Sequence, residues 1–204
     1  KKRAYIVNKI EYSGEFFSGT RAELVAAVKQ SLSEHRFQHV LRVEQAAIKL
    51  AKLNDVSTEK ASIAALTHDY SKERSDSEFK ETIKKYSMDP DLLNWGNFIW
   101  HGVVGAQIVS HELGITDPEI LNAISRHTVG APKMTKLDQL IYVADFVEDG
   151  RDFPDAQIAR SLAYADLQAA VIFETKHTLQ YLMSSNKTIY PAAIQTYNAW
   201  VAGH

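Results

Sequence analysis

Six histidine and aspartate side chains are spaced along the chain in a way that suits metal binding. They are a histidine, an adjacent His-Asp pair, two further histidines and a late aspartate, namely His39, His68, Asp69, His101, His127 and Asp145. Each lies on or at the end of an apolar stretch with helical periodicity, where a single histidine is more often a hydrogen-bonded core residue. Burying the whole set is costly unless divalent cations compensate its members together. The set therefore predicts a metal site built by several helices.

The pair His68-Asp69 is the sharpest local signal in this set. Adjacent residues of a helix point about 100° apart, so both reach one metal only near a helix end or a distortion. The apolar stretch that begins near residue 61 ends at this pair, which predicts a helix end there. Because the chain has no cysteine, the ligands must be imidazole and carboxylate, a combination that suits iron, manganese, zinc or cobalt. A carboxylate can also bridge two ions through its two oxygens.

The elements that must position these residues are predicted to be helices. Apolar residues recur at every third or fourth position along most of the chain, and no alternating strand pattern of useful length is present, so the predicted fold is all-α. Capping signals predict helix starts after Thr20, Ser75 and Thr135. Asp-Pro pairs at 89–90 and 117–118 predict two more starts, and Gly114 is the expected end of a helix over residues 103–113. Residues 156–183 and 191–202 also have helical spacing.

Length and charge limit the classes of protein that remain. The 204 residues suit one domain, which we expect over residues 20–204 after a flexible or weakly packed extension, residues 1–19. The 23 Lys and Arg against 25 Asp and Glu give a net charge of -2, which provides no basic field for nucleic acid. No run approaches the roughly 18 apolar residues of a membrane span, and Lys1 to Asn8 lacks a signal peptide's apolar stretch. We therefore expect a cytoplasmic protein with no membrane partner.

Taken together, these features resemble the HD-domain superfamily, whose pattern is a histidine, then His-Asp, then two histidines in its two-metal members, then a late aspartate. The resemblance narrows to the YqeK-type bacterial symmetrical bis(5'-nucleosyl)-tetraphosphatases. It covers roughly residues 20–200 and rests on the strings HRFQHV at 35–40, AALTHDYSK at 64–72, WHGVVG at 100–105, ISRHTVG at 124–130, IYVADFVE at 141–148 and RDFP at 151–154.

The resemblance implies a single HD-domain helical bundle that hydrolyses diadenosine tetraphosphate into two ADP at a dinuclear metal centre, with iron as the expected metal. It makes the six histidines and aspartates the metal ligands, with Asp69 as the bridge between two ions. Asp69 and Lys72 are then the expected catalytic residues. Manganese, cobalt or zinc would also suit the same ligands.

Further residues are expected to contact the phosphates of such a substrate, namely Arg36, Lys72, Thr128, Gly130, Lys133 and Arg151. Lys72 lies three residues after Asp69 and could place its ammonium against a polyphosphate oxygen, and the two arginines are similar candidates. All three could instead be solvated surface charges. The Thr128 hydroxyl and the Gly130 N–H, just past His127, could also bind phosphate, although an ordinary helix end would have the same residues. Lys133 follows at a place where the family carries an arginine, and it could replace that charge.

The remaining histidines and several aromatic residues have weaker functional signals. The histidines that fit no ligand position are expected at the surface, namely His35, His111, His177 and His204. Some aromatic residues could stack an adenine, but core packing is the favoured interpretation for Trp95, Trp100, Tyr142 and Phe146.

Two other functions fit the same residues. The same six metal ligands would equally serve an HD phosphohydrolase that acts on a mononucleotide or a guanosine alarmone. A non-catalytic nucleotide-sensing or protein-binding module could keep the fold, although such a module has no reason to keep six buried polar ligands. A homodimer is also compatible with the sequence, because an exposed apolar helix face could provide its interface.

Overall fold

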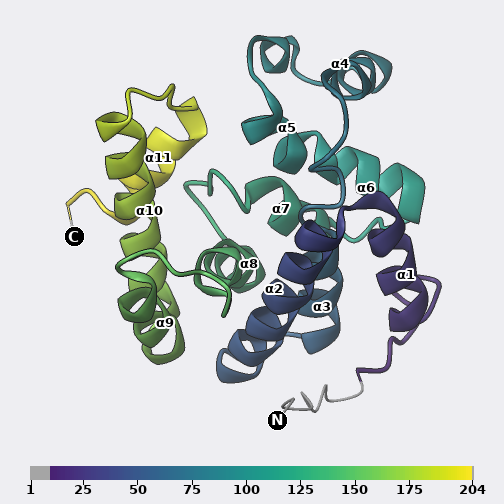
Figure 1. Cartoon of the computed structure of the whole chain (residues 1–204), viewed down its shortest axis with the longest axis horizontal. Helices are drawn as coiled ribbons and strands as arrows, with labels where there is room; N and C mark the ends of the chain where they lie inside the picture. The colour runs from purple at the N-terminus through teal and green to yellow at the C-terminus, as the bar shows by residue number, and fades with distance from the viewer. Residues whose placement is uncertain (1–9, 204) are drawn as a thin grey trace.

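Helices provide all the regular secondary structure within residues 10–203, which are the residues that the computed structural model describes (Figure 1). The predicted all-α fold is thus confirmed. The helices are α1 (Arg21–Ser31), α2 (Glu34–Leu53), α3 (Thr58–Thr67), α4 (Asp76–Lys85), the 3-10 helix η1 (Pro90–Asn94), α5 (Asn97–Val103), α6 (Gly105–Leu113), α7 (Pro118–Arg126), α8 (Lys136–Val147), α9 (Ala156–Ala165), α10 (Leu167–Ser184) and α11 (Pro191–Trp200).

Side-chain caps fix the starts of most of these helices. Thr20, Ser75 and Thr135 each form a complete capping box, in which the side chain of the residue three positions later returns a bond to the cap. Asp117 caps α7 ahead of its proline, and Gly114 ends α6 in the left-handed conformation with φ of 68°. Helix α3 ends at residue 67, so the His-Asp pair lies at a helix end as the sequence predicts.

Three elements differ from the sequence-based expectation. The helix expected over residues 103–113 begins earlier and is divided into α5 and α6 at Val104. The chain passes close to Ser71 there, because a Cβ on Gly105 would lie 2.6 Å from the Ser71 hydroxyl. A second break separates α9 from α10 at Asp166, whose carboxylate accepts from the N–H of residue 169 and so starts a new helix. The Asp-Pro pair at 89–90 opens a 3-10 helix instead of an α-helix.

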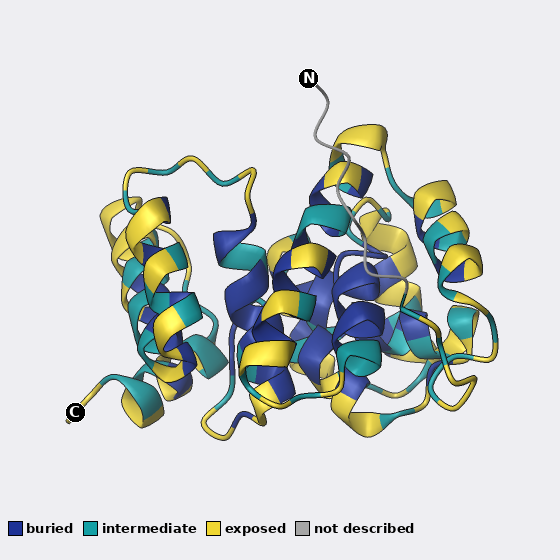
Figure 2. Ribbon diagram, turned by 90° about the horizontal axis from the view of Figure 1, so that it is seen from below, coloured by how far each residue is buried: buried dark blue, intermediate teal, exposed yellow. Residues whose placement is uncertain are grey.

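Helices α2, α3, α7 and α8 form the middle of the molecule, where the dark blue of buried residues concentrates (Figure 2). Helix α8 packs against α2, α3 and α7 on one side and against α9 and α10 on the other. Figure 1 shows α9, α10 and α11 together on the far side of α8 from α1 to α6. Residues from all four middle helices are fully buried, for example Val43, Leu66, Ile124 and Ile141. This core holds the helices that carry the histidines and aspartates in fixed relative positions.

The segment before α1 is expected to be a flexible or weakly packed extension, and residues 1–9 of it lie outside the described part of the chain. Residues 10–19 contact the domain. The Tyr12 hydroxyl lies 2.7 Å from the Ser62 hydroxyl oxygen on α3, and the backbone N–H of Ser13 donates to Glu59 at 2.8 Å. These contacts hold the second half of the segment against α3.

None of the described helices combines the length and the apolar character that a bilayer span requires.

Leu66 offers a test of how far the core supports the site, because it is fully buried two residues before the His-Asp pair. Leu66→Ala should lower the free energy of unfolding by about 2–5 kcal/mol, since the cavity it leaves adds to the lost burial. Leu53→Ala is the matched control, because Leu53 is 57% exposed, and its effect should stay within about 0.5 kcal/mol. Urea unfolding followed by circular dichroism measures both, and equal effects would contradict the packing described.

Candidate metal centre

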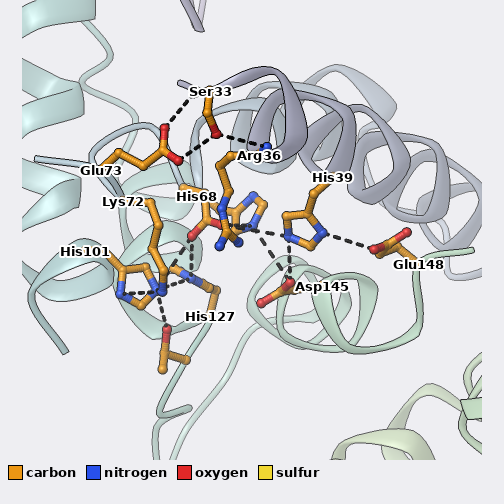
Figure 3. Close-up of polar contacts among 12 residues, drawn as sticks. Ser33, Arg36, His39, His68, Lys72, Glu73, His101, His127, Asp145 and Glu148 are labelled. Carbon is orange, nitrogen blue, oxygen red and sulfur yellow. Dashed lines mark hydrogen bonds and ion pairs between the residues drawn. The ribbon is translucent and has the colours of Figure 1, made fainter. Parts of the chain in front are cut away.

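Five different elements bring the six histidines and aspartates to one place (Figure 3). The middle of α2, the end of α3, α5, the end of α7 and α8 supply, in that order, His39, His68 with Asp69, His101, His127 and Asp145. All are buried except Asp145, which is partly exposed. Side chains separated by up to 106 positions in the sequence thus face one another inside the bundle.

Asp69 lies between two pairs of imidazoles. Its Oδ2 atom is 3.8 Å from His39 Nε2 and 3.6 Å from His68 Nε2. Its Oδ1 atom is 3.6 Å from His101 Nε2 and 3.8 Å from His127 Nε2. One carboxylate therefore offers one oxygen to each of two histidine pairs, which is the arrangement of a bridging ligand.

Asp145 completes the first of these groups. Its Oδ1 atom is 3.1 Å from His39 Nε2 and 3.9 Å from His68 Nε2. Donor atoms within 4.8 Å of one another are found in three overlapping sets, each suited to holding a cation: His39 with His68 and Asp69, His68 with His127 and Asp145, and Asp69 with His101 and His127. The mixture of imidazole nitrogen and carboxylate oxygen suits the transition metals named above.

The orientation of the imidazoles is set by their second nitrogen atoms. The Nδ1 atoms of His68, His101 and His127 lie 2.6–2.7 Å from backbone carbonyl oxygens three or four positions earlier in the chain. A carbonyl oxygen only accepts, so Nδ1 carries the hydrogen and the Nε2 lone pair points toward Asp69. Each of these three rings is thus held in the tautomer that a metal requires.

Two observations show that these residues fit metal ions. The buried His68 Nε2 has no hydrogen-bond partner among the residues described. His101 Nε2 and His127 Nε2 lie 3.1 Å apart with both rings protonated on Nδ1, so two lone pairs face each other. Neither ring has a second hydrogen to donate to the other, so this close approach of lone pairs favours positive charge beside it, which a metal ion would supply in addition to the Lys72 ammonium at His101.

The charge states of the buried groups match this requirement. Burial lowers the pKa of His101 to about 3 and that of His127 to about 4, with neighbouring positive charges acting in the same direction. Both are therefore neutral near pH 7, which is the form that binds a metal. Burial alone would raise the pKa of Asp69, but the positive charge that the surrounding histidines carry at low pH outweighs it and holds that pKa below its usual value. Asp69 is thus an ionised carboxylate.

Glu148 lies at the site although no role was predicted for it from the sequence. Its Oε1 atom accepts from His39 Nδ1 at 3.1 Å, and its Oε2 atom accepts from Arg42 Nε at 2.6 Å. Burial raises the pKa of Glu148, but the hydrogen bonds from His39 and Arg42 outweigh it and bring the pKa to about 2. Glu148 is one helical turn after Asp145, and that spacing is the sequence signal that could have identified it.

Two of the expected phosphate-binding residues lie beside His101. The Lys72 ammonium is partly buried and lies 3.1 Å from His101 Nε2, and the Thr128 hydroxyl donates to the same nitrogen at 3.1 Å. Both residues line the cleft that opens onto the centre. Burial is the main cause of the lowered pKa of Lys72.

The two expected arginines pair with the two aspartates of the centre. Arg36 Nη1 donates to Asp69 Oδ2 at 3.0 Å, and Arg151 Nη2 donates to Asp145 Oδ1 at 2.7 Å. Guanidinium groups in these positions extend the positive charge of the site from α2 to the segment after α8.

Gly130 and Lys133 are placed differently from the other candidates. The Gly130 N–H donates to the carbonyl oxygen of residue 126 at 2.8 Å, so it closes the end of α7 and is not free for phosphate. A Cβ on Gly130 would lie 2.6 Å from Thr196 of α11, whose hydroxyl donates to the carbonyl oxygen of Val129 at 2.8 Å. Trp200, also on α11, donates to the carbonyl of residue 131 at 2.9 Å. Lys133 is exposed and does not line the cleft.

A cleft of about 520 Å³ opens onto the centre and has an aromatic wall. Beside Lys72, Thr128 and Arg151, its lining includes Phe98, Phe146, Phe153, Glu174, His177 and Tyr181. Of the aromatic residues weighed in the sequence, Trp100 and Tyr142 are buried in the core as favoured, whereas Phe146 faces the cleft. For His177 the sequence predicts only a surface position, because nothing in one sequence shows that α10 borders the site.

Comparisons with known proteins are consistent with one family. The HD domain profile matches residues 36–148. The symmetrical bis(5'-nucleosyl)-tetraphosphatase of Bacillus subtilis is 43% identical over 183 residues, which cover 90% of this chain and 98% of that protein. The protein of the same name from Halalkalibacterium halodurans is 39% identical, covering 87% and 95% of the two chains. A crystal structure of a predicted HD superfamily hydrolase involved in NAD metabolism, from Clostridium acetobutylicum, has a TM-score of 0.85 at 28% identity, covering 91% of this chain and 99% of that one.

The shared position of Asp69 predicts how metal content should respond to single substitutions. His39→Ala should lose one ion and keep the other, His101→Ala should do the same on the opposite side, and Asp69→Ala should lose both. His111→Ala, which changes a histidine outside the centre, should keep the wild-type content. Elemental analysis by mass spectrometry after gel filtration gives ions per chain. Loss of both ions in His39→Ala and His101→Ala would contradict two separable groups.

Glu148→Gln should weaken metal binding without removing a ligand. The neutral amide accepts a weaker hydrogen bond from His39 and leaves Arg42 unpaired, so the dissociation constant for the metal should rise about tenfold to a hundredfold. Competition titration with a chromophoric chelator measures it. Glu81→Gln on the exposed face of α4 is the matched control, and an unchanged constant in Glu148→Gln would exclude the orienting role.

Proposed function

The chain belongs to the HD-domain family and, within it, to the symmetrical bis(5'-nucleosyl)-tetraphosphatases, and on this basis we propose that it hydrolyses diadenosine tetraphosphate to two ADP. The observation that carries the proposal is the shared Asp69 carboxylate with two imidazoles at each of its oxygens. Curated relatives of that name match nearly the whole chain, which supports the same substrate class.

Symmetrical cleavage defines the bonds that change. A water oxygen forms a bond to one β-phosphorus, and the bond from that phosphorus to the central bridging oxygen breaks. One ADP departs with the bridging oxygen, and the other ADP carries the oxygen of the water. ADP carries the departing charge on a phosphate oxygen, which lessens the need for a strong general acid. Two divalent ions held by His39, His68, Asp69, His101, His127 and Asp145 would lower the pKa of water and neutralise phosphate charge.

The residues of the chain position the polyanion. Lys72, Thr128 and Arg151 line the cleft beside the centre, and Arg36 lies against Asp69. We assign Lys72 and the arginines to the phosphate oxygens, where their fixed positive charge stabilises the charge that develops at the reacting phosphorus. Asp69 is the proposed ligand shared by the two ions. We propose it as a catalytic residue because it would hold both ions next to each other. Gly130 and Lys133 are left out of this assignment because of their positions.

The nature of the metal is a further part of the proposal. We propose iron, as the resemblance implies, while manganese, cobalt and zinc suit the same donor set. A cytoplasmic location and a homodimer are also expectations of the proposal, and size-exclusion chromatography with light scattering tests the second.

A product assay tests the activity. With diadenosine tetraphosphate, the purified protein should release ADP as its one nucleotide product, chelation should stop the release, and added metal should restore it. His68→Ala and Asp69→Ala should each abolish turnover while circular dichroism shows an unchanged helix content, with His111→Ala as the active control.

The assay also separates the alternatives. Cleavage of another nucleotide in place of diadenosine tetraphosphate would keep the metal centre and overturn the substrate. Absence of any cleavage with iron or manganese supplied would favour a binding module. AMP and ATP as products would contradict symmetrical attack.

A further inference from the structure

Two large aromatic side chains are exposed beside the metal centre. Phe98 is 48% exposed and Tyr181 is 59% exposed, and both line the cleft of about 520 Å³. Among the described residues, they are the only Phe, Tyr or Trp side chains that are exposed. Aromatic faces left open next to a charged centre point to a ligand with both a flat apolar part and an anionic part.

The two residues come from different walls of the cleft. Phe98 lies at the start of α5, and Tyr181 lies near the end of α10, with the segment that links α7 to α8 between these helices in Figure 1. On α10, the residues Glu174, His177 and Tyr181 follow one another at helical spacing and all line the cleft. The wall therefore runs along one face of α10, away from the metal centre.

The inner part of this wall is already filled by aromatic contacts. The ring centroid of His177 lies 5.4 Å from that of Phe146 and 5.1 Å from that of Phe153. Phe146 directly follows Asp145 in the chain, so the aromatic surface begins at the metal centre and continues outward. Its outer end is Tyr181, which is 59% exposed and stacks on no other aromatic ring among the described residues, so its ring is free to stack on a ligand.

Glu174 is a second, independent sign of a ligand. Its side chain is buried in the wall of the cleft, and its Oε2 atom has no hydrogen-bond partner among the residues described. A buried polar atom without a partner is unfavourable, and a bound molecule with amino or hydroxyl groups would satisfy it.

We propose that Phe98 and Tyr181 form a nucleobase subsite, in which one purine of the substrate stacks while its phosphates lie at the metal centre. This inference rests on the proposed function, since it names the part of the enzyme that holds a nucleoside half of the dinucleotide. A nucleoside polyphosphate has both parts that this cleft would bind. Its flat base can stack on Phe98 and Tyr181, and its phosphates can pair with Lys72 and Arg151. Glu174 is the polar partner for the nucleoside between these two ends.

Truncation of either aromatic side chain tests the subsite. Phe98→Ala and Tyr181→Ala should each raise KM for diadenosine tetraphosphate by about tenfold, as expected for loss of a base-stacking contact, with kcat changed less than about twofold. Tyr181→Phe should keep the wild-type KM because the ring remains. Met183→Ala is the matched control, because Met183 is also 59% exposed on α10 and does not line the cleft.

Equilibrium binding separates this inference from the proposed function. Calorimetric titration of the metal-loaded protein with ADP should show the same tenfold loss in Phe98→Ala and Tyr181→Ala, whereas binding of inorganic pyrophosphate, which has no base, should be unchanged. If wild type binds ADP more tightly than pyrophosphate but does not cleave diadenosine tetraphosphate, the proposed function is wrong and the subsite stands. Unchanged KM and ADP affinity in both variants, an equal loss for pyrophosphate, or no preference of wild type for ADP would each overturn the subsite.

Discussion

The buried Asp69 carboxylate, shared by two pairs of imidazoles, is the arrangement on which the rest of the structure depends. Isolated, a negative charge at this depth would be strongly unfavourable, and so would the four imidazoles with their lone pairs directed at one another. Together they form a set of donors that divalent cations would stabilise, and these donors come from α2, the end of α3, α5 and the end of α7. The packing of these helices against one another directs the donors to the same point.

The orientation of the histidines follows from where they lie on their helices. His68 and His127 follow the last residues of α3 and α7, where backbone carbonyls lack donors within the helix, and their Nδ1 atoms bond to such carbonyls. His39 lies in the middle of α2, where the carbonyls already accept from the helix. Its Nδ1 atom bonds instead to a side chain from another element, the carboxylate of Glu148.

Local signals in the sequence account for much of this fold. The capping boxes at Thr20, Ser75 and Thr135 depend only on neighbouring residues, so their helix starts could be predicted. The close approach of Ser71 at the break between α5 and α6 depends on residues far apart in the chain, and one sequence does not contain that contact. The aromatic wall of α10 escaped prediction for the same reason, whereas the six histidines and aspartates could be grouped because their residue types are rare in apolar helices.

The contacts of Thr196 and Trp200 with the backbone of residues 129 and 131 have a consequence for the synthesis of the protein. Helix α11 holds the segment that follows His127, and it is made long after the last aspartate of the centre. Because translation proceeds from the N-terminus, all six side chains of the candidate centre are made before the helix that contacts the segment after His127. The final geometry of this part of the candidate centre is therefore set late, by the order of translation.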